Sequence, residues 1–206
     1  HTNQNAKDFK ICKCKHENIN EWKEYIPATD GVLIGTFTLL NNWMVRSEIR
    51  NALSKLYVRN LNTNKEDELT ITDENVITPG SSLMQKNRNT NKLYVAYHSP
   101  KTPGKSYIYD IVTKEKKLVK EEEVPSGHNP NDYLVERLSC DSHDGKKIPL
   151  TITRHKKTKL DGSANLLLYA YGSYGASMGP GFSSSRLSLI NRNIIWVTAH
   201  IRGGME

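Results

Sequence analysis

The fold is decided by LLLYAYGSYG, the stretch from Leu166 to Gly175. Its first half is an apolar run of strand length, and a near-continuous apolar run predicts a strand that is buried on both faces. Its second half places Gly172 and Gly175 after that strand, where glycine lets the backbone turn sharply and approach a ligand closely. The stretch therefore predicts a buried strand that ends in a tight loop.

A second apolar run, Ile194 to Ala199, follows the same pattern and leads into His200 and then Arg202-Gly203-Gly204. Between the two runs, Arg186 to Asn191 has the apolar spacing of a short helix, and Ser183 to Ser185 are good N-cap candidates before it. The order strand, glycine-rich loop, helix and strand predicts the start of an α/β layer.

The chain before about residue 124 has a different character, because short alternating runs are separated by polar turns. Such pairs of runs predict β-hairpins, here Phe9–Cys14 with Trp22–Ile26, Leu56–Leu61 with Glu68–Ile71, and Tyr107–Ile111 with Lys117–Val119. Further strands are expected at Ile34–Leu40, Trp43–Ile49 and Leu93–Tyr97. The hairpins recur every ~45–50 residues, which is typical of propeller blades and equally compatible with an ordinary antiparallel β-domain.

The linker between the two regions is rich in helix and strand breakers and runs from Val124 to Pro130. After it, Tyr133 to Cys140 and Ile148 to Arg154 are predicted strands around the turn Asp144-Gly145. The chain therefore changes its architecture close to this linker.

Composition excludes several classes of protein. The 206 residues carry a net charge of +7, and 36% of them are hydrophobic, which is typical of a globular protein. Lysine and arginine are scattered without a dense patch, which argues against nucleic-acid binding, and no apolar run approaches the ~18 residues of a membrane span. Because no export signal is visible and the three cysteines suggest a reducing compartment, we expect a cytoplasmic protein without membrane partners.

Cys12, Cys14 and His16 are spaced as a possible metal clip. However, they alternate with lysines as in a strand, and no second pair of ligands follows at the spacing of a zinc site. We expect no metal and no cofactor.

Three tyrosines of the glycine-rich loop, Tyr169, Tyr171 and Tyr174, bring hydroxyl donors to one turn. A phenol donates a hydrogen bond without carrying charge, which suits the stabilisation of a developing oxyanion; the alternative is a tight turn with half-buried tyrosines that fill an ordinary interface. Ser173 is not expected to be a nucleophile, because the nucleophile elbow needs glycine two residues to either side and Tyr171 occupies one of those places.

The second glycine block leaves similar alternatives open. Arg202 beside paired glycines could bind a carboxylate or anchor a loop, and His200 has no identifiable serine or aspartate partner in the sequence. Taken singly, both residues favour a structural role.

Taken together, these blocks resemble the oligopeptidase B (protease II) branch of the prolyl oligopeptidase family of serine peptidases. The resemblance rests on LLLYAYGSYG and on HIRGG from His200 to Gly204, at this separation. It is supported by shorter matches at Glu123–Pro125, Tyr133, Glu136–Leu138, Asp144-Gly145, Ile148–Leu150, Phe182-Ser183, Ser185–Leu189 and Glu206.

The resemblance implies a mixed fold, in which the C-terminal blades of a β-propeller are followed by the first strands of a truncated α/β-hydrolase domain. Residues 1–124 would be the last blades, residues 125–132 a linker, and residues 133–206 the N-terminal part of the peptidase domain. The family's Ser-Asp-His triad would lie beyond this chain, so we expect the chain alone to be inactive.

The resemblance also implies roles for two tyrosines. Tyr171 matches the residue whose hydroxyl helps to form the oxyanion hole, and Tyr174 matches an aromatic residue that lines the substrate pocket. The implied substrates are short basic peptides, cleaved after Arg or Lys. The loop that includes Gly179 and Gly181 carries no carboxylate, which puts a dibasic preference in doubt.

Two alternatives to a section of one peptidase stay open. The chain could be a non-catalytic remnant that binds peptides or a partner protein, or one half of a split peptidase whose triad is supplied by a separate chain. An adjacent reading frame that encodes the missing elbow would favour the split enzyme.

Overall fold

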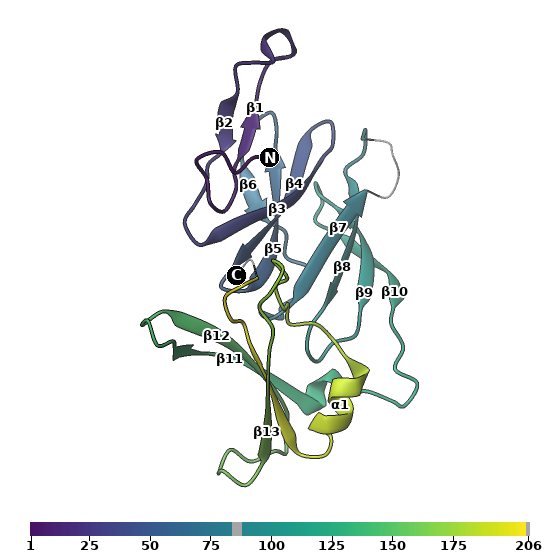
Figure 1. The fold of residues 1–206 in the computed structure, drawn as a ribbon. Helices are drawn as coiled ribbons and strands as arrows, with labels where there is room; N and C mark the ends of the chain where they lie inside the picture. The colour runs from purple at the N-terminus through teal and green to yellow at the C-terminus, as the bar shows by residue number, and fades with distance from the viewer. Residues whose placement is uncertain (84–87, 205–206) are drawn as a thin grey trace.

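The computed structural model describes residues 1–83 and 88–204, and these residues form one two-stranded and three four-stranded sheets (Figure 1). The N-terminal hairpin consists of β1 (Ile11–Lys13) and β2 (Lys23–Ile26), joined by a loop that contains the 3₁₀ turn η1 (His16–Asn18). Its two strands are antiparallel, which confirms the first predicted hairpin.

Sheet I is an antiparallel meander of four strands that follow one another in the chain: β3 (Val32–Leu39), β4 (Trp43–Arg50), β5 (Leu53–Asn60) and β6 (Glu66–Glu68). Strands β4 and β5 are joined by Asn51 and Ala52, which both have positive φ angles of 48° and 58°. Two left-handed residues form the tight turn whose twist matches that of the paired strands.

Sheet II repeats this order with β7 (Thr78–Leu83), β8 (Lys92–His98), β9 (Lys105–Asp110) and β10 (Lys116–Glu121). The two sheets pack face to face through a shared core. Sheet I and its loops contribute Leu40, Val45, Leu56, Val58, Leu69 and Ile71, and sheet II and its loops contribute Leu93, Val95, Tyr97, Tyr109 and Ile111. Successive four-stranded meanders stacked in this way are the building plan of a propeller.

The hairpins and single strands predicted in this region are found, but the strand that pairs with β5 is β6 at Glu66–Glu68 and not the predicted Glu68–Ile71. Strand β7 was not predicted. Its sequence begins Thr-Pro-Gly-Ser and lacks the alternation of apolar and polar residues that marks a strand. Its pairing with β8, in which Thr78 lies opposite His98, supplies its hydrogen bonds. This pairing stabilises a strand that the sequence pattern does not predict.

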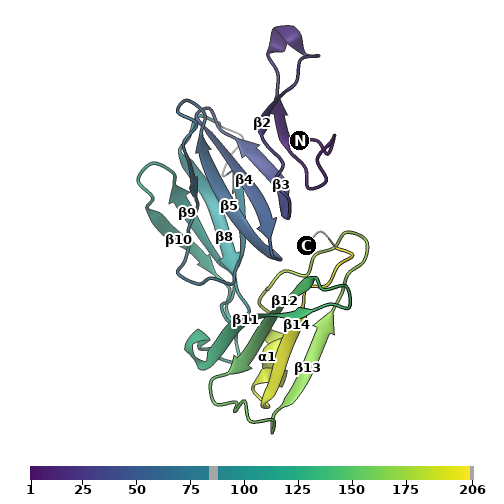
Figure 2. The same cartoon turned by 90° about the vertical axis from the view of Figure 1, so that its left-hand side faces the viewer.

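Sheet III contains β11 (Tyr133–Asp141), β12 (Lys147–His155), β13 (Asn165–Ala170) and β14 (Ile194–Ala199), in the spatial order β11-β12-β14-β13. The 3₁₀ turn η2 (Pro130–Asp132) leads into it. The pairs β11–β12 and β12–β14 are antiparallel, whereas β13 and β14 are parallel. Sheet III lies at one end of sheets I and II (Figure 2).

Helix α1 (Ser184–Ile190) makes the crossover between the two parallel strands. The Ser183 side chain caps the helix by accepting a hydrogen bond from the backbone N–H of Arg186, and Leu187 and Ile190 are buried against sheet III. The predicted order of strand, loop, helix and strand is confirmed. The helix begins two residues earlier than predicted because the serines join its first turn.

One prediction about burial is wrong. The apolar run of β13 was expected to be covered on both faces, but Leu166 is 58% exposed and Leu168 is 62% exposed. Among the described residues β13 is an edge strand of sheet III, so fewer neighbours cover it. Strand β14, which lies inside the sheet, does bury most of its side chains.

No helix among the described residues has the length and apolar character required to cross a lipid bilayer.

Candidate functional site

The parallel pairing of β13 and β14 places the two glycine-rich blocks at the same edge of sheet III. Ala170 and Ala199, the last residues of the two strands, lie opposite one another. The loops that follow therefore leave the sheet side by side, with Tyr171 beginning one and His200 the other.

The two loops touch through their backbones, and glycine permits the contact. A Cβ atom on Gly172 would lie 2.3 Å from the carbonyl oxygen of Arg202, and one on Gly203 would lie 2.0 Å from the carbonyl oxygen of Gly172. Gly203 also has a φ of 108°, which L side chains rarely adopt. Any side chain at either position would push the loops apart.

Arg202 anchors the second loop to the turn between β11 and β12. Its Nη1 donates to Asp144 Oδ2 at 2.6 Å, and its Nη2 donates to Ser142 Oγ at 3.3 Å. The hydrogen bond from Arg202 holds the pKa of the Asp144 carboxyl below its usual range. Of the two roles left open by the sequence, the structure supports the loop anchor.

His200 is buried beneath the same loop, and its partner is a threonine that the sequence did not suggest. Its Nε2 lies 2.7 Å from Thr151 Oγ1, and Arg137 Nη1 donates to the same hydroxyl oxygen at 2.7 Å. Burial lowers the pKa of His200 to about 4, and the positive charge of Arg137 adds to this effect. The imidazole is therefore neutral at physiological pH, and it has a structural role as a buried, hydrogen-bonded side chain.

Arg137 carries this chain of contacts to sheet I, because its Nη2 donates to the backbone carbonyl of Asn51 in the β4–β5 turn. A run of polar contacts thus leads from a turn of sheet I to the base of the glycine loop. No residue pattern in the sequence pointed to it, since Arg137 and Asn51 lie 86 positions apart.

The structure places the two predicted site tyrosines in the first loop. Tyr171 is 39% exposed and Tyr174 is 98% exposed, and Tyr174 has a positive φ of 56°. Ser173 belongs to a turn in which its carbonyl accepts from the N–H of Ala176. Tyr169 differs from both, because its ring stacks on Trp196 with the ring centroids 5.9 Å apart.

A cavity of about 440 Å³ adjoins the second loop. Arg202, Gly203 and Gly204 form one wall, and the N-terminal segment with Asp8 and Asp30 contributes to the other. Asp8 also accepts a hydrogen bond from the N–H of Gly31. This open space is of a size that can accommodate a small ligand.

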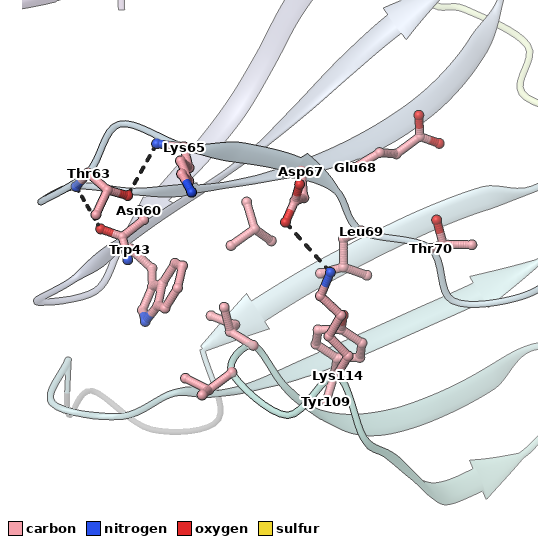
Figure 3. Close-up of a pocket in the computed structure, with 13 residues that line it drawn as sticks. Trp43, Asn60, Thr63, Lys65, Asp67, Glu68, Leu69, Thr70, Tyr109 and Lys114 are labelled. Atoms are coloured by element: carbon pink, nitrogen blue, oxygen red, sulfur yellow. Dashed lines mark hydrogen bonds and ion pairs between the residues drawn. The ribbon is translucent and has the colours of Figure 1, made fainter.

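A second cavity, of about 660 Å³, lies between sheets I and II (Figure 3). Its lining includes Trp43 and Tyr109, and Asp67 and Lys114 form an ion pair of 3.6 Å across it. Among the described residues it is lined by strands of sheets I and II and by the loops that adjoin them, so it is separate from the tyrosine loop. No group of three or more potential metal ligands is found in the described part of the chain.

Comparison with known proteins identifies the architecture of the first part. Residues 1–122 match the prolyl oligopeptidase N-terminal β-propeller domain. The chain belongs to the prolyl oligopeptidase family. Sheets I and II are thus propeller blades, and the alternative of an ordinary antiparallel β-domain is excluded.

Curated relatives span the whole chain. It is 35% identical to dipeptidyl aminopeptidase BI of Pseudoxanthomonas mexicana over 204 residues, covering 98% of this chain and 28% of that protein. It is 25% identical to protease 2 of Moraxella lacunata, covering all of this chain and 29% of the relative.

Solved structures of the same family are similar in fold. Oligopeptidase B from Trypanosoma brucei, in a closed form with covalently bound antipain, superposes with a TM-score of 0.84 at 30% identity, over 94% of this chain and 28% of that one. Oligopeptidase B from Leishmania major gives a TM-score of 0.79 at 26% identity, over 88% of this chain and 26% of that one. The chain thus spans less than a third of these relatives.

Proposed function

We propose that this chain is a section of an oligopeptidase-B-like serine peptidase, with the last propeller blades at residues 1–124, a linker at 125–132 and the start of an α/β-hydrolase domain at 133–206. Two observations support the division. The strand pairing of sheet II ends with β10 at Glu121, and a new sheet begins with β11 at Tyr133. The mixed order of sheet III, with α1 as the crossover between parallel strands, is compatible with a hydrolase core.

The observation that carries the proposal is the backbone contact between Gly172 and Gly203. It fixes the loop that begins with Tyr171 against a second loop, which Arg202 in turn anchors to the sheet. A catalytic donor has to be held rigidly where negative charge develops, and such preorganisation is the source of its effect.

In the proposed mechanism, the Tyr171 hydroxyl donates a hydrogen bond to the oxyanion that forms when a serine attacks the scissile carbonyl. The serine, aspartate and histidine of the triad are supplied by the longer protein, outside this chain. Tyr174, which is exposed at the tip of the same loop, contributes an aromatic wall for the substrate. A donor in the position of Tyr171 contributes about 3 kcal/mol to transition-state stabilisation.

The substrates proposed are short basic peptides cleaved after Arg or Lys, in the cytoplasm, and no cofactor is required. The segment from Ser177 to Gly181 has no carboxylate with which to attract a second basic side chain. We therefore propose that a single basic residue suffices for recognition.

The experiment is Tyr171→Phe in the full-length protein, assayed on an arginyl amide. The expected result is a fall in kcat of about 10²- to 10³-fold with little change in KM, because the hydroxyl acts in the transition state. Tyr169→Phe is the matched control, since the Tyr169 ring stacks on Trp196, and its activity should stay within a few-fold of the parent. An unchanged kcat in Tyr171→Phe would exclude the oxyanion role.

A second candidate activity is the release of dipeptides from free N-termini, which is favoured by the 35% identity to dipeptidyl aminopeptidase BI. Arginyl substrates with a free and with a blocked α-amino group separate the two activities. An enzyme that cleaves after basic residues within a peptide accepts both, whereas one that removes dipeptides requires the free amine.

The non-catalytic and split alternatives predict other outcomes for the chain by itself. A binding remnant would hold basic peptides without turnover, and a split peptidase would gain turnover when the chain carrying the triad is added. Turnover by the pure chain alone that a serine-directed phosphonate abolishes would contradict the placement of the triad outside it.

A further inference from the structure

His98 ends strand β8 of sheet II and contacts the loop that precedes helix α1. The backbone N–H of Phe182 donates to His98 Nδ1 at 3.0 Å. Because a backbone N–H can only donate, Nδ1 must accept, and it therefore carries no proton. The bond joins residues 84 positions apart and ties sheet II to the segment between the tyrosine loop and α1.

The surrounding loop packs closely on the His98 ring. A Cβ atom on Gly181 would lie 2.8 Å from His98 Cε1, so the chain passes directly against the imidazole. On the preceding turn, Gly179 approaches Thr78, the residue opposite His98 in the β7–β8 pair. The end of the β7–β8 hairpin therefore holds the loop at two neighbouring points.

Phe182 is well placed to transmit this contact to the helix. It precedes the N-cap Ser183 and packs in the same cluster as Leu187 of the first turn. A hydrophobic residue before the cap that contacts the fourth helical residue fixes the angle at which the chain enters a helix. Holding the backbone of Phe182 therefore also holds the start of α1.

The charged groups that act on His98 are Arg186 of α1, which donates from Nη1 to the Gly181 carbonyl at 3.0 Å, and Glu122, which follows β10. A further titratable side chain, His128 of the linker, contacts the neighbouring Phe182 ring edge-on at 5.3 Å between centroids. Burial lowers the pKa of His98 below its ordinary value; Glu122 opposes this shift and Arg186 adds to it. At neutral pH the imidazole is uncharged and able to accept.

We propose that His98 is a positioning residue through which the propeller holds the loop before α1, and that protonation of His98 releases this loop. An imidazolium would present N–H to the N–H of Phe182, so two donors would face each other. It would also place a positive charge in the environment of Arg186. The inference goes beyond the proposed peptidase function and does not require it, because its readout is structural.

The test is the amide hydrogen exchange of Phe182 in the full-length protein, corrected for the intrinsic rate at each pH. His98→Leu removes the acceptor and is expected to speed exchange about tenfold, the equivalent of one ordinary hydrogen bond. His98→Asn places an amide oxygen near the site of Nδ1 and should keep the exchange slow. His16→Leu, a change at an exposed histidine of η1, is the matched control and should alter nothing.

Acidification provides the second arm. As the pH falls below the ordinary histidine pKa of 6.5, the parent protein should lose protection at Phe182, whereas His98→Asn, which cannot titrate, should keep it. Unchanged exchange in His98→Leu, or equally fast exchange in the Asn and Leu variants, would overturn the proposal. Should His98→Leu fail to fold, identical pH dependence of the parent and His98→Asn would overturn it as well.

Discussion

Lowering the pH from about 7.5 to about 5 is expected to destabilise the fold around His200 by about 2 kcal/mol. The unfolded chain binds the proton near the ordinary pKa of 6.5, whereas burial lowers the pKa in the folded chain to about 4. Between these values the unfolded state binds more protons. The free energy of unfolding therefore falls as the pH is lowered through this window.

The magnitude follows from the width of the window. Each pH unit below 6.5 costs about 1.4 kcal/mol until the folded chain begins to take up the proton, which gives about 2 kcal/mol at about pH 5. This pH lies above the ordinary pKa range of the carboxylates, so their protonation contributes little. The whole His200 contribution would be lost only near pH 4.

The assay is urea unfolding at both pH values, followed by tryptophan fluorescence. One of the three tryptophans, Trp196, lies on β14, the strand that His200 follows directly. His200→Gln is the informative variant, because its amide can still accept from the Thr151 hydroxyl and cannot titrate. His200→Gln in a His98→Asn background removes the half-buried His98, whose pKa is also lowered, from the comparison. If His200→Gln retained the full pH dependence of its parent, the assignment to His200 would be refuted.

Two further substitutions test the packing of the chain. Gly203→Ala should cost about 2 kcal/mol or more in the free energy of unfolding, since its Cβ would lie 2.0 Å from the Gly172 carbonyl oxygen at a φ that only glycine favours; a variant as stable as the parent would show that the two loops separate freely. Arg46→Met should cost about 3 kcal/mol, because it leaves the buried Glu48 carboxylate with weaker compensation. Adding Glu48→Gln to Arg46→Met should then recover part of that loss, as measured by chemical denaturation. No recovery would contradict a charge effect.

The strands were predictable wherever a single strand carries its own pattern. Leu93 to Tyr97 alternates between buried and half-buried side chains in the structure, as its sequence indicated. By contrast, β7 is held in place by its pairing with β8, and its own residues, with Pro79 and Gly80 among them, would predict a loop. The alternation of apolar and polar residues identifies a strand that buries one of its own faces. It does not identify a strand that is stabilised mainly by pairing with its neighbour.

The two loops of the candidate site were predictable from the sequence, but the contacts that support them were not. The glycine blocks pointed to two loops after two strands, and the parallel register of β13 and β14 explains why these loops meet. The contacts of His200 with Thr151, and of His98 with Phe182, depend on the fold bringing distant segments together. The spacing of residues in the sequence does not predict such pairs, so the partner of His200 could not be predicted from the sequence.

Hydrogen bonds between the propeller and the rest of the chain share a chemical form that bears on how the two parts can separate. In each, a side chain of one part bonds a backbone group of the other: Arg137 of sheet III to the Asn51 carbonyl, His98 to the Phe182 N–H, and His128 of the linker to the Lys101 carbonyl. Such bonds constrain the position of the chain. They do not depend on the side chain of the residue that supplies the backbone group.

Each of these bonds is sensitive to substitution of the residue that supplies the side chain, and not of the residue that supplies the backbone group. Changing Arg137 or His98 removes a bond, whereas changing Asn51 or Phe182 leaves the backbone group in place. Each bond contributes about 1 kcal/mol, far less than the apolar core that joins the two blades. We therefore expect these bonds to break before either part unfolds, and the bond of His98 is the one that acidification should break first.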